Sequence, residues 1–337
     1  MITKQKFRIK HFGIILYTVV CVCIFLLFAC NGTKPDISNI DLKVEIQRLD
    51  QDIFEAPVDE LPGKYGLFFE YYTHDILGIG EYHDSAFLHN LQLFKTAPIV
   101  QRAQKDVKAQ YPDLNELNRK FTQAFKYYRY YFPDRYIPRI FSYISGYNQS
   151  LILSDSVIGI GLDKYLGANY KLYNELSFAK YLSKNMDRKK ILSDCISTWT
   201  GNEWTLDLKA NNDLISKMLH EGKILYATKM ILPDEADSLI FGFSSKQLSW
   251  CKNNEKNMWV HLIEHKLLFS TDHFKIIKLT EDAPNTSEFT AESPGKACNW
   301  LGYKIIAQYM KNNPQTLSEL MNNNDYRKIL DKSKYKP

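Results

Sequence analysis

The sequence predicts an α+β fold that is mostly helical, with one small antiparallel sheet packed on helices. Three short segments rich in β-branched residues lie close together at 140–145, 150–153 and 157–162, separated by Gly, Asn, Asp and Ser. The long stretches on either side, within 60–131 and from 176 onward, carry apolar residues at helical spacing. No internal repeat is visible, so we expect one globular domain.

The first thirty residues have the features of a bacterial lipoprotein signal peptide. A basic start without acids, Met1 to His11, precedes an apolar run from Phe12 to Ala29, and Cys30 follows directly. A basic region, an apolar region and a small residue before the cut are typical of a secretory signal. We therefore predict that residues 1–29 are removed and that Cys30 is acylated, for example with palmitate, as the mature N-terminus. The alternative is an uncleaved anchor helix, since an apolar run of roughly 18 residues can span a bilayer.

Charge and composition exclude a nucleic-acid partner. Removal of residues 1–29 from the 337 leaves 308 residues, and four of the 43 Lys and Arg residues go with them. The mature chain then has 39 basic against 38 acidic residues, an excess of one positive charge. Such a balance has no electrostatic footprint for nucleic acid. The hydrophobic share of 45% fits an ordinary packed globule.

The elements before the sheet follow from their patterns. Residues 30–42 are polar and broken by Gly32 and Pro35, which predicts a flexible tether ahead of a single domain over 43–337. Val44 to Asp50 alternates apolar and polar residues, which predicts a half-buried strand. Helical spacing then dominates until Pro133.

After the sheet, four helices are predicted, at 212–230, 246–269, 295–311 and a short one beyond Pro314. Ser293-Pro294 is a cap followed by a first-turn proline and is expected to open the third of them. Trp300, Leu301 and Ile305 are expected on its interior face.

The three cysteines of the mature chain beyond Cys30 do not form a metal-binding pattern. Cys195, Cys251 and Cys298 are an odd number at wide spacings, so at most one disulfide joins two of them. Separate buried thiols are the favoured interpretation, and a disulfide stays open.

The sharpest chemical motif is His261-Leu262-Ile263-Glu264-His265, which matches the H-x-x-E-H signature of inverted zinc peptidases. Two histidines four residues apart on a helix share a face and suit one Zn²⁺, with Glu264 as the base for a bound water. A catalytic zinc needs a third protein ligand, and no nearby acid stands in a context that marks it. We therefore predict no metal and no cofactor, with a zinc peptidase using His261, Glu264 and His265 as the alternative.

Two further candidates are weaker. His220-Glu221 begins H-E-x-x-H, but Ile224 stands where the second histidine belongs. The aromatic run Tyr127 to Phe132 offers a stacking platform for a glycan-binding lipoprotein, although aromatic helices are more often core.

Five segments, taken together, resemble the gliding motility lipoprotein GldB family of Bacteroidota. The segments occur in the same order as in the family and are spread over the mature chain, and the last residues, Lys334 to Pro337, also resemble the family. The predicted lipoprotein signal is consistent with this resemblance. The segments are Val44–Phe54, Ile160–Gly167, Gly222–Asp234, Leu267–Asp272 and Glu292–Ile306.

This resemblance implies an envelope lipoprotein of the gliding-motility machinery, held to a membrane through its lipid and facing the periplasm or the cell surface. It attaches no active-site residue to the chain, so a non-catalytic role in binding a protein or cell-wall partner is expected. The resemblance also implies a degenerate zincin-like metallopeptidase fold. In such a fold the helix after Leu162 holds H-E-x-x-H, but here that helix, around Ile191 to Ile196, contains no histidine.

Overall fold

The computed structural model describes residues 34–154 and 156–337, so Cys30 and the predicted signal peptide lie outside the described residues. The chain divides into two compact units, Met1–Asn39 and Ile40–Pro337. Within the described part of the first unit, the Ser38 amide donates to Asp36 Oδ1 at 2.9 Å. Across the described ranges, no helix combines the length and the apolar character that crossing a membrane requires.

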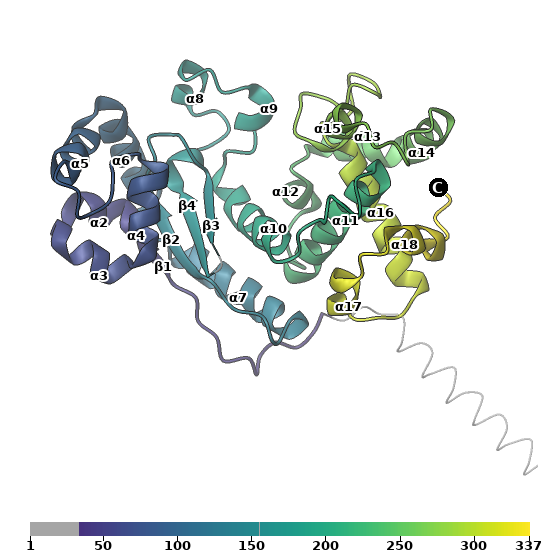
Figure 1. Cartoon of the computed structure of the whole chain (residues 1–337), viewed down its shortest axis with the longest axis horizontal. Coiled ribbons are helices and arrows are strands. Elements are labelled where there is room, and N and C mark those ends of the chain that lie inside the picture. Colours follow the sequence, from purple (N-terminus) through teal and green to yellow (C-terminus); the bar gives the residue numbers. More distant parts are fainter. Residues whose placement is uncertain (1–33, 155) are drawn as a thin grey trace, which may run out of the picture. The chain divides into compact units, whose positions relative to one another are not determined.

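The second unit contains one mixed sheet of four strands in the order β1-β2-β4-β3 (Figure 1). The strands are β1 (Ile46–Arg48), β2 (Arg139–Tyr143), β3 (Leu151–Ser154) and β4 (Val157–Gly161). Strands β1 and β4 both run parallel to β2, and only β3 and β4 pair antiparallel. The predicted α+β class with one small sheet is confirmed, but the expectation of a purely antiparallel sheet was wrong.

The connections explain this difference. Parallel neighbours need a long crossover, and the helices of residues 49–131 provide it between β1 and β2. Strands β3 and β4 are separated by only two residues of the sequence, which suits their antiparallel pairing. The loop after β2 is held by Asp163, whose Oδ2 accepts the backbone N–H groups of Ser145 and Tyr147.

Helices before β2 that lie within residues 49–96 form a largely aromatic core with Phe141 and Tyr143 of β2 and Ile152 of β3. The Phe68 ring stacks on Phe141 of β2 with centroids 4.4 Å apart, and the Tyr72 hydroxyl donates to the Ile144 carbonyl at 2.7 Å. The elements are α2 (Leu49–Glu55), η1 (Val58–Glu60), α3 (Leu61–Tyr65), α4 (Leu67–Tyr71), the π-helical η2 (Tyr72–Ile76), α5 (Phe87–Thr96), α6 (Pro98–Gln110) and α7 (Asn115–Tyr131).

The chain after the sheet is helical, as predicted. Its elements are η3 (Leu162–Lys164), α8 (Lys171–Glu175), α9 (Lys180–Ser183), η4 (Arg188–Lys190), α10 (Ile191–Glu203), α11 (Leu214–Ile231), α12 (Asp237–Phe241), α13 (Ser245–Asn253), α14 (Glu255–Glu264), α15 (His273–Thr280), α16 (Ala297–Asn312), α17 (Leu317–Asn322) and α18 (Tyr326–Ser333). The helix expected at 212–230 is α11. The stretch 246–269 is two helices rather than one, because the backbone leaves helical geometry at Asn254.

The predicted cap of α16 is also corrected. The helix begins at Ala297 after Lys296, whose backbone is left-handed. Ser293 is buried and does not cap it; its hydroxyl donates to the Thr290 carbonyl at 2.7 Å and accepts from the Thr286 amide at 3.1 Å. Ser293 thus closes the loop before the helix. The predicted burial of Trp300, Leu301 and Ile305 is confirmed, as all three are buried.

Helices α11 and α16 pack together at two glycines. A Cβ on Gly222 would lie 2.4 Å from the Gly302 carbonyl carbon, and one on Gly302 would lie 1.9 Å from the Met218 oxygen. The two backbones are therefore in direct contact. This contact fixes Glu221 of α11 relative to the first turn of α16, and both line the cleft described next.

Candidate functional site

A polar cleft of about 640 Å³ lies between the sheet and the C-terminal helices. The loop before β3, η3 and the segment around α9 line one side, and α12 and the first turn of α16 line another. Helices α10 and α11 contribute Asp194, Thr198 and Glu221. These elements can be followed in Figure 1 from β3 through α10 and α11 to α12.

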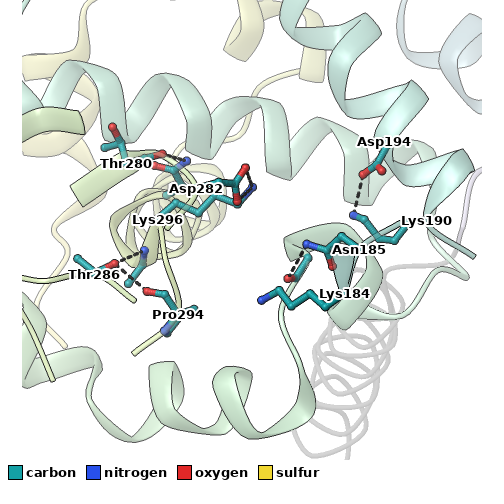
Figure 2. A network of polar contacts seen from close by, with 12 residues as sticks. Lys184, Asn185, Lys190, Asp194, Thr280, Asp282, Thr286, Pro294 and Lys296 are labelled. Carbon is teal, nitrogen blue, oxygen red and sulfur yellow. Dashed lines mark hydrogen bonds and ion pairs between the residues drawn. The ribbon is translucent and has the colours of Figure 1, made fainter. Parts of the chain in front are cut away.

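Lysine–carboxylate pairs line this cleft (Figure 2). Lys190 Nζ lies 2.8 Å from Asp194 Oδ1, and Lys296 Nζ lies 2.9 Å from Asp282 Oδ1. Glu221 pairs at 2.9 Å with Lys217, one turn earlier on α11. Each of these three carboxylates therefore has its own lysine.

Lys184, at the end of α9, differs from the lysines beside it. Its Nζ donates to Gln247 Oε1 at 3.2 Å, and no carboxylate of the described residues forms an ion pair with it. Burial lowers its pKa; Asp282 opposes this shift, while the positive charges of Lys296 and Lys190 add to it. Figure 2 shows the Lys184 side chain extending from α9 beside the labelled pairs. Lys184 is thus a partly buried cation flanked by other cations.

Lys164, which follows β4 in η3, lines the cleft and lies next to the buried Asp163. Asp163 is fully buried, and burial raises the pKa of its carboxyl to about 6 against the opposing effect of the Tyr147 and Ser145 amides. Neighbouring Lys164 donates from Nζ to the Tyr147 carbonyl at 3.2 Å and lies 4.0 Å from the centroid of the Phe178 ring. Burial lowers the pKa of Lys164, and the charge of Asp163 opposes that shift.

The rest of the lining combines apolar surface with one buried amide. Its aromatic residues are Tyr165, Phe178, Tyr181, Phe241, Phe243 and Trp300. Asn299, 7% exposed, donates from Nδ2 to the Thr280 carbonyl at 3.0 Å, while its Oδ1 has no partner in the described structure. No histidine or cysteine of the described residues lines this cleft. The arrangement is suited to binding a polar ligand with apolar parts.

The structure brings the predicted His261 and His265 together at the end of α14. Their rings stack with centroids 4.0 Å apart, and His265 Nδ1 lies 3.0 Å from the His261 carbonyl. Glu288 Oε2 is the nearest acid, 4.0 Å from His261 Nε2, which forms no hydrogen bond in the described structure. Within residues 34–154 and 156–337, no group of three or more His, Cys, Asp or Glu residues is arranged to hold a metal ion.

The other sequence candidates are mostly core. His220 of α11 is buried, with Nδ1 3.1 Å from the Tyr326 hydroxyl. Tyr127 and Tyr128 are buried, while Tyr130 of that run is half exposed, which leaves little surface for the alternative of a glycan platform. The three cysteines described in the structure, Cys195, Cys251 and Cys298, are free and buried.

A family model described as "Gliding motility protein GldB" matches residues 30–337. The chain belongs to this family. GldB membership makes it a gliding-motility protein of a lipoprotein family and indicates a membrane-anchored place in the envelope. No curated protein and no solved structure matches the chain. The resemblance inferred from the sequence is thereby confirmed.

The residues of this GldB cleft were not found from the sequence. Lys190, Asp282 and Lys296 are ordinary charged residues spread over more than a hundred positions. No motif or spacing joins them. Only the packing of α10 and α16 brings them together, so no sequence signal was available.

Proposed function

We propose that this GldB protein is anchored through acylated Cys30 and works in the gliding-motility machinery by binding a protein or cell-wall partner in the cleft. Residues 30–42 serve as the tether and 43–337 as the binding domain, which faces the periplasm or the cell surface. The protein does not catalyse a reaction on its partner. Family membership supports the envelope role, and the composition of the cleft supports binding.

The observation that carries this proposal is the set of lysine–carboxylate pairs along the cleft. Many catalytic sites hold a nucleophile or a metal next to a base of suitable pKa. Here Asp194, Asp282 and Glu221 each accept a lysine instead. Paired charges beside aromatic surface provide orientation and specificity for a ligand, as polar groups do in binding sites.

Photo-crosslinking from within the cleft tests the proposal. A photoreactive phenylalanine analogue replaces Tyr181, a half-buried residue of the lining, in full-length protein expressed in its own cells. Tyr136 is exposed, does not line the cleft and serves as the matched control position. We expect an adduct with one envelope component from position 181 and none from position 136.

A blocking variant strengthens this test. Thr198 is an exposed residue of α10 that lines the cleft, so Thr198→Trp fills part of it while Thr198→Ser does not. The adduct from position 181 is expected to disappear in Thr198→Trp and to persist in Thr198→Ser. Absence of any adduct from position 181, or equal adducts from both positions, would contradict binding in the cleft.

A further inference from the structure

We infer that the partner of this GldB protein binds as an extended peptide segment that pairs with the free edge of β3 and places a basic side chain in a groove behind that strand. The inference rests on the proposed binding function of the cleft and names the conformation and charge of what binds there. Three observations carry it: the unpaired backbone of β3, the cavities on both of its faces, and the carboxylates of the second face.

Strand β3 forms an edge of the sheet, because it pairs only with β4 (Figure 1). The Gly161 amide donates to the Ser150 carbonyl at 2.8 Å, and hydrogen-bonded positions alternate along an antiparallel pair. Ile152 is therefore bonded to β4, while the backbone N–H and C=O groups of Leu151 and Leu153 point away from it.

These outward groups are available to a further strand. No residue of the described ranges forms a hydrogen bond with the backbone N–H or C=O of Leu153. The Leu151 carbonyl accepts only the side-chain amide of Gln149, at 3.1 Å, and Gln149 is exposed and can move aside. An open strand edge of this kind pairs readily with an extended segment of another chain.

The cleft continues along one face of β3. Neighbouring side chains of a strand point to opposite faces, so Leu151 and Leu153 share a face. Leu151 lines the cleft, and Leu153 lines a neighbouring cavity of about 540 Å³. Ser197, Thr198 and Glu221 line both, so the two cavities adjoin.

The opposite face of β3 borders a separate cavity of about 560 Å³, which we call the rear groove. Ile152 and Ser154 line it from β3, and Leu67 and Tyr71 line it from α4. Leu67 is 82% exposed and Tyr71 is 45% exposed, so apolar surface is open there. A strand paired with β3 places its side chains alternately in the cleft and in the rear groove. A polysaccharide has no regular backbone N–H and C=O groups for this edge, so the geometry favours a peptide.

The charges of the rear groove indicate a basic side chain. Glu70, Asp75 and Glu81 line the groove, and no lysine or arginine of the described residues does. Asp75 Oδ1 lies 2.7 Å from His74 Nδ1, whereas Glu70 and Glu81 form no ion pair within the described ranges. A lysine or arginine of the partner supplies the complementary charge, which contributes more to specificity than to affinity.

Photo-crosslinking from both faces of β3 tests the inference in full-length protein expressed in its own cells. A photoreactive phenylalanine analogue replaces Tyr71 in the rear groove, and its adduct is compared with the adduct from Tyr181 in the cleft. We expect both positions to crosslink to one continuous segment of the same polypeptide, next to a lysine or arginine, as identified by mass spectrometry. Position 136 again serves as the control.

Two variants of Leu153 test the pairing with β3. Leu153→Pro removes the outward N–H without removing a hydrogen bond to β4, and proline is tolerated at such edge positions. Leu153→Ala shortens the same side chain but keeps the N–H. The adduct from position 71 is expected to fall about fivefold or more in Leu153→Pro relative to Leu153→Ala, the range for a lost hydrogen bond. Equal thermal unfolding midpoints show that both variants are folded.

A double variant tests the basic side chain. Glu70→Gln combined with Glu81→Gln removes two charges of the rear groove and is expected to lower the adduct from position 71 about threefold, as for exposed ion pairs. Glu60→Gln changes an exposed acid that does not line the groove and should behave as wild type.

A synthetic peptide with the sequence of the crosslinked segment gives a test that does not depend on the folding of a variant. Its binding to the wild-type mature chain is measured with backbone nitrogens methylated at alternate residues, in the two possible phases. Only every second N–H of a strand faces a given neighbour. One phase is therefore expected to abolish binding and the other to retain it.

The outcomes separate this inference from the proposed function. An adduct from position 181 without one from position 71, or equal binding of the two methylated peptides, contradicts pairing with β3 while leaving binding in the cleft intact. Equal adducts in folded Leu153→Pro and Leu153→Ala do the same. An adduct with a glycan contradicts the peptide, and an undiminished adduct in the double variant contradicts the basic side chain. No adduct from either position overturns both the inference and the proposed function.

Discussion

Burial changes the protonation of individual side chains that look ordinary in the sequence. His220 on α11 is 5% exposed, and burial with the charges of Lys223 and Lys217 lowers its pKa to about 3. Lys223 donates to the Met321 carbonyl at 3.1 Å and the Asn323 carbonyl at 2.9 Å, at the end of α17. His220, through the Tyr326 hydroxyl, and Lys223 therefore join α11 to the C-terminal helices.

The lowered pKa of His220 predicts a loss of stability in mild acid. Between its folded pKa of about 3 and the ordinary value of 6.5, the unfolded chain binds a proton that the folded chain does not. Stability from this residue is therefore complete above pH 6.5 and falls as the pH decreases below it, by about 2 kcal/mol between pH 7 and pH 5. Urea unfolding at both pH values measures the change.

His220→Gln is the control for this prediction, because glutamine can bond the Tyr326 hydroxyl but does not titrate. Its difference in unfolding free energy between pH 7 and pH 5 is expected to be smaller than that of the wild type by the same amount. An identical difference in both proteins would show that His220 is protonated in the folded state.

We predict that the purified mature domain binds no stoichiometric zinc at the His261 and His265 pair. A catalytic zinc normally has three protein ligands, and the nearest acid, Glu288, is 4.0 Å from His261 Nε2. Elemental analysis after gentle purification measures the metal. About one zinc per chain that is lost in His261→Ala and His265→Ala would instead support the peptidase alternative. Unfolding at the same temperature with and without chelator is expected, since a structural metal couples binding to folding.

At the scale of elements, the periodicity of apolar residues predicted the positions of helices and strands well. It predicted less well where each helix begins and how the strands pair. The position of α11 follows from the spacing of apolar residues, and the positions of β2, β3 and β4 follow from their β-branched residues. Both are local properties of the chain. The predicted N-terminal cap of α16 was wrong, because the Ser293 hydroxyl forms hydrogen bonds with Thr286 and Thr290 instead. The sheet is mixed and not purely antiparallel. Whether neighbouring strands run parallel depends on the connections between them, and the periodicity of the sequence does not reveal those connections.

The crossing of α11 and α16 predicts a strong effect of one added methyl group. Gly302→Ala places a Cβ 1.9 Å from the Met218 oxygen, which cannot yield without separating the helices. We expect a loss of about 1–3 kcal/mol in the free energy of unfolding, typical of overpacking. Gly201→Ala on α10 is the matched control, since its Cβ meets Ile224 at an ordinary 3.4 Å. It should be neutral or stabilising, because alanine is the better helix former. Similar losses in both variants would argue against the close crossing.

At the scale of the whole molecule, we expect the protein to be attached to a membrane through Cys30. A Cys30→Ser variant is expected to lose its acyl label and to accumulate as an unprocessed precursor, because the lipid is attached before the signal is cut. Metabolic labelling with a fatty acid and the mass of the product measure both effects. The several acyl chains of a lipoprotein satisfy the need for more than one chain in stable anchoring. A wild type that is membrane-bound, unacylated and of full precursor size would instead support the spanning helix.

The sequence by itself determined the family, the mostly helical α+β class and the places of the main helices and of strands β2 to β4, and it predicts an export signal. These depend on local order: an apolar run before Cys30, periodic apolar residues, and segments that resemble a family from Val44 to Ile306. Only the tertiary structure decided the mixed sheet and the cleft. Lys190 with Asp194 and Lys296 with Asp282 line the same cleft only because the fold brings these distant segments together, since charge interactions depend on distance in space and not along the chain.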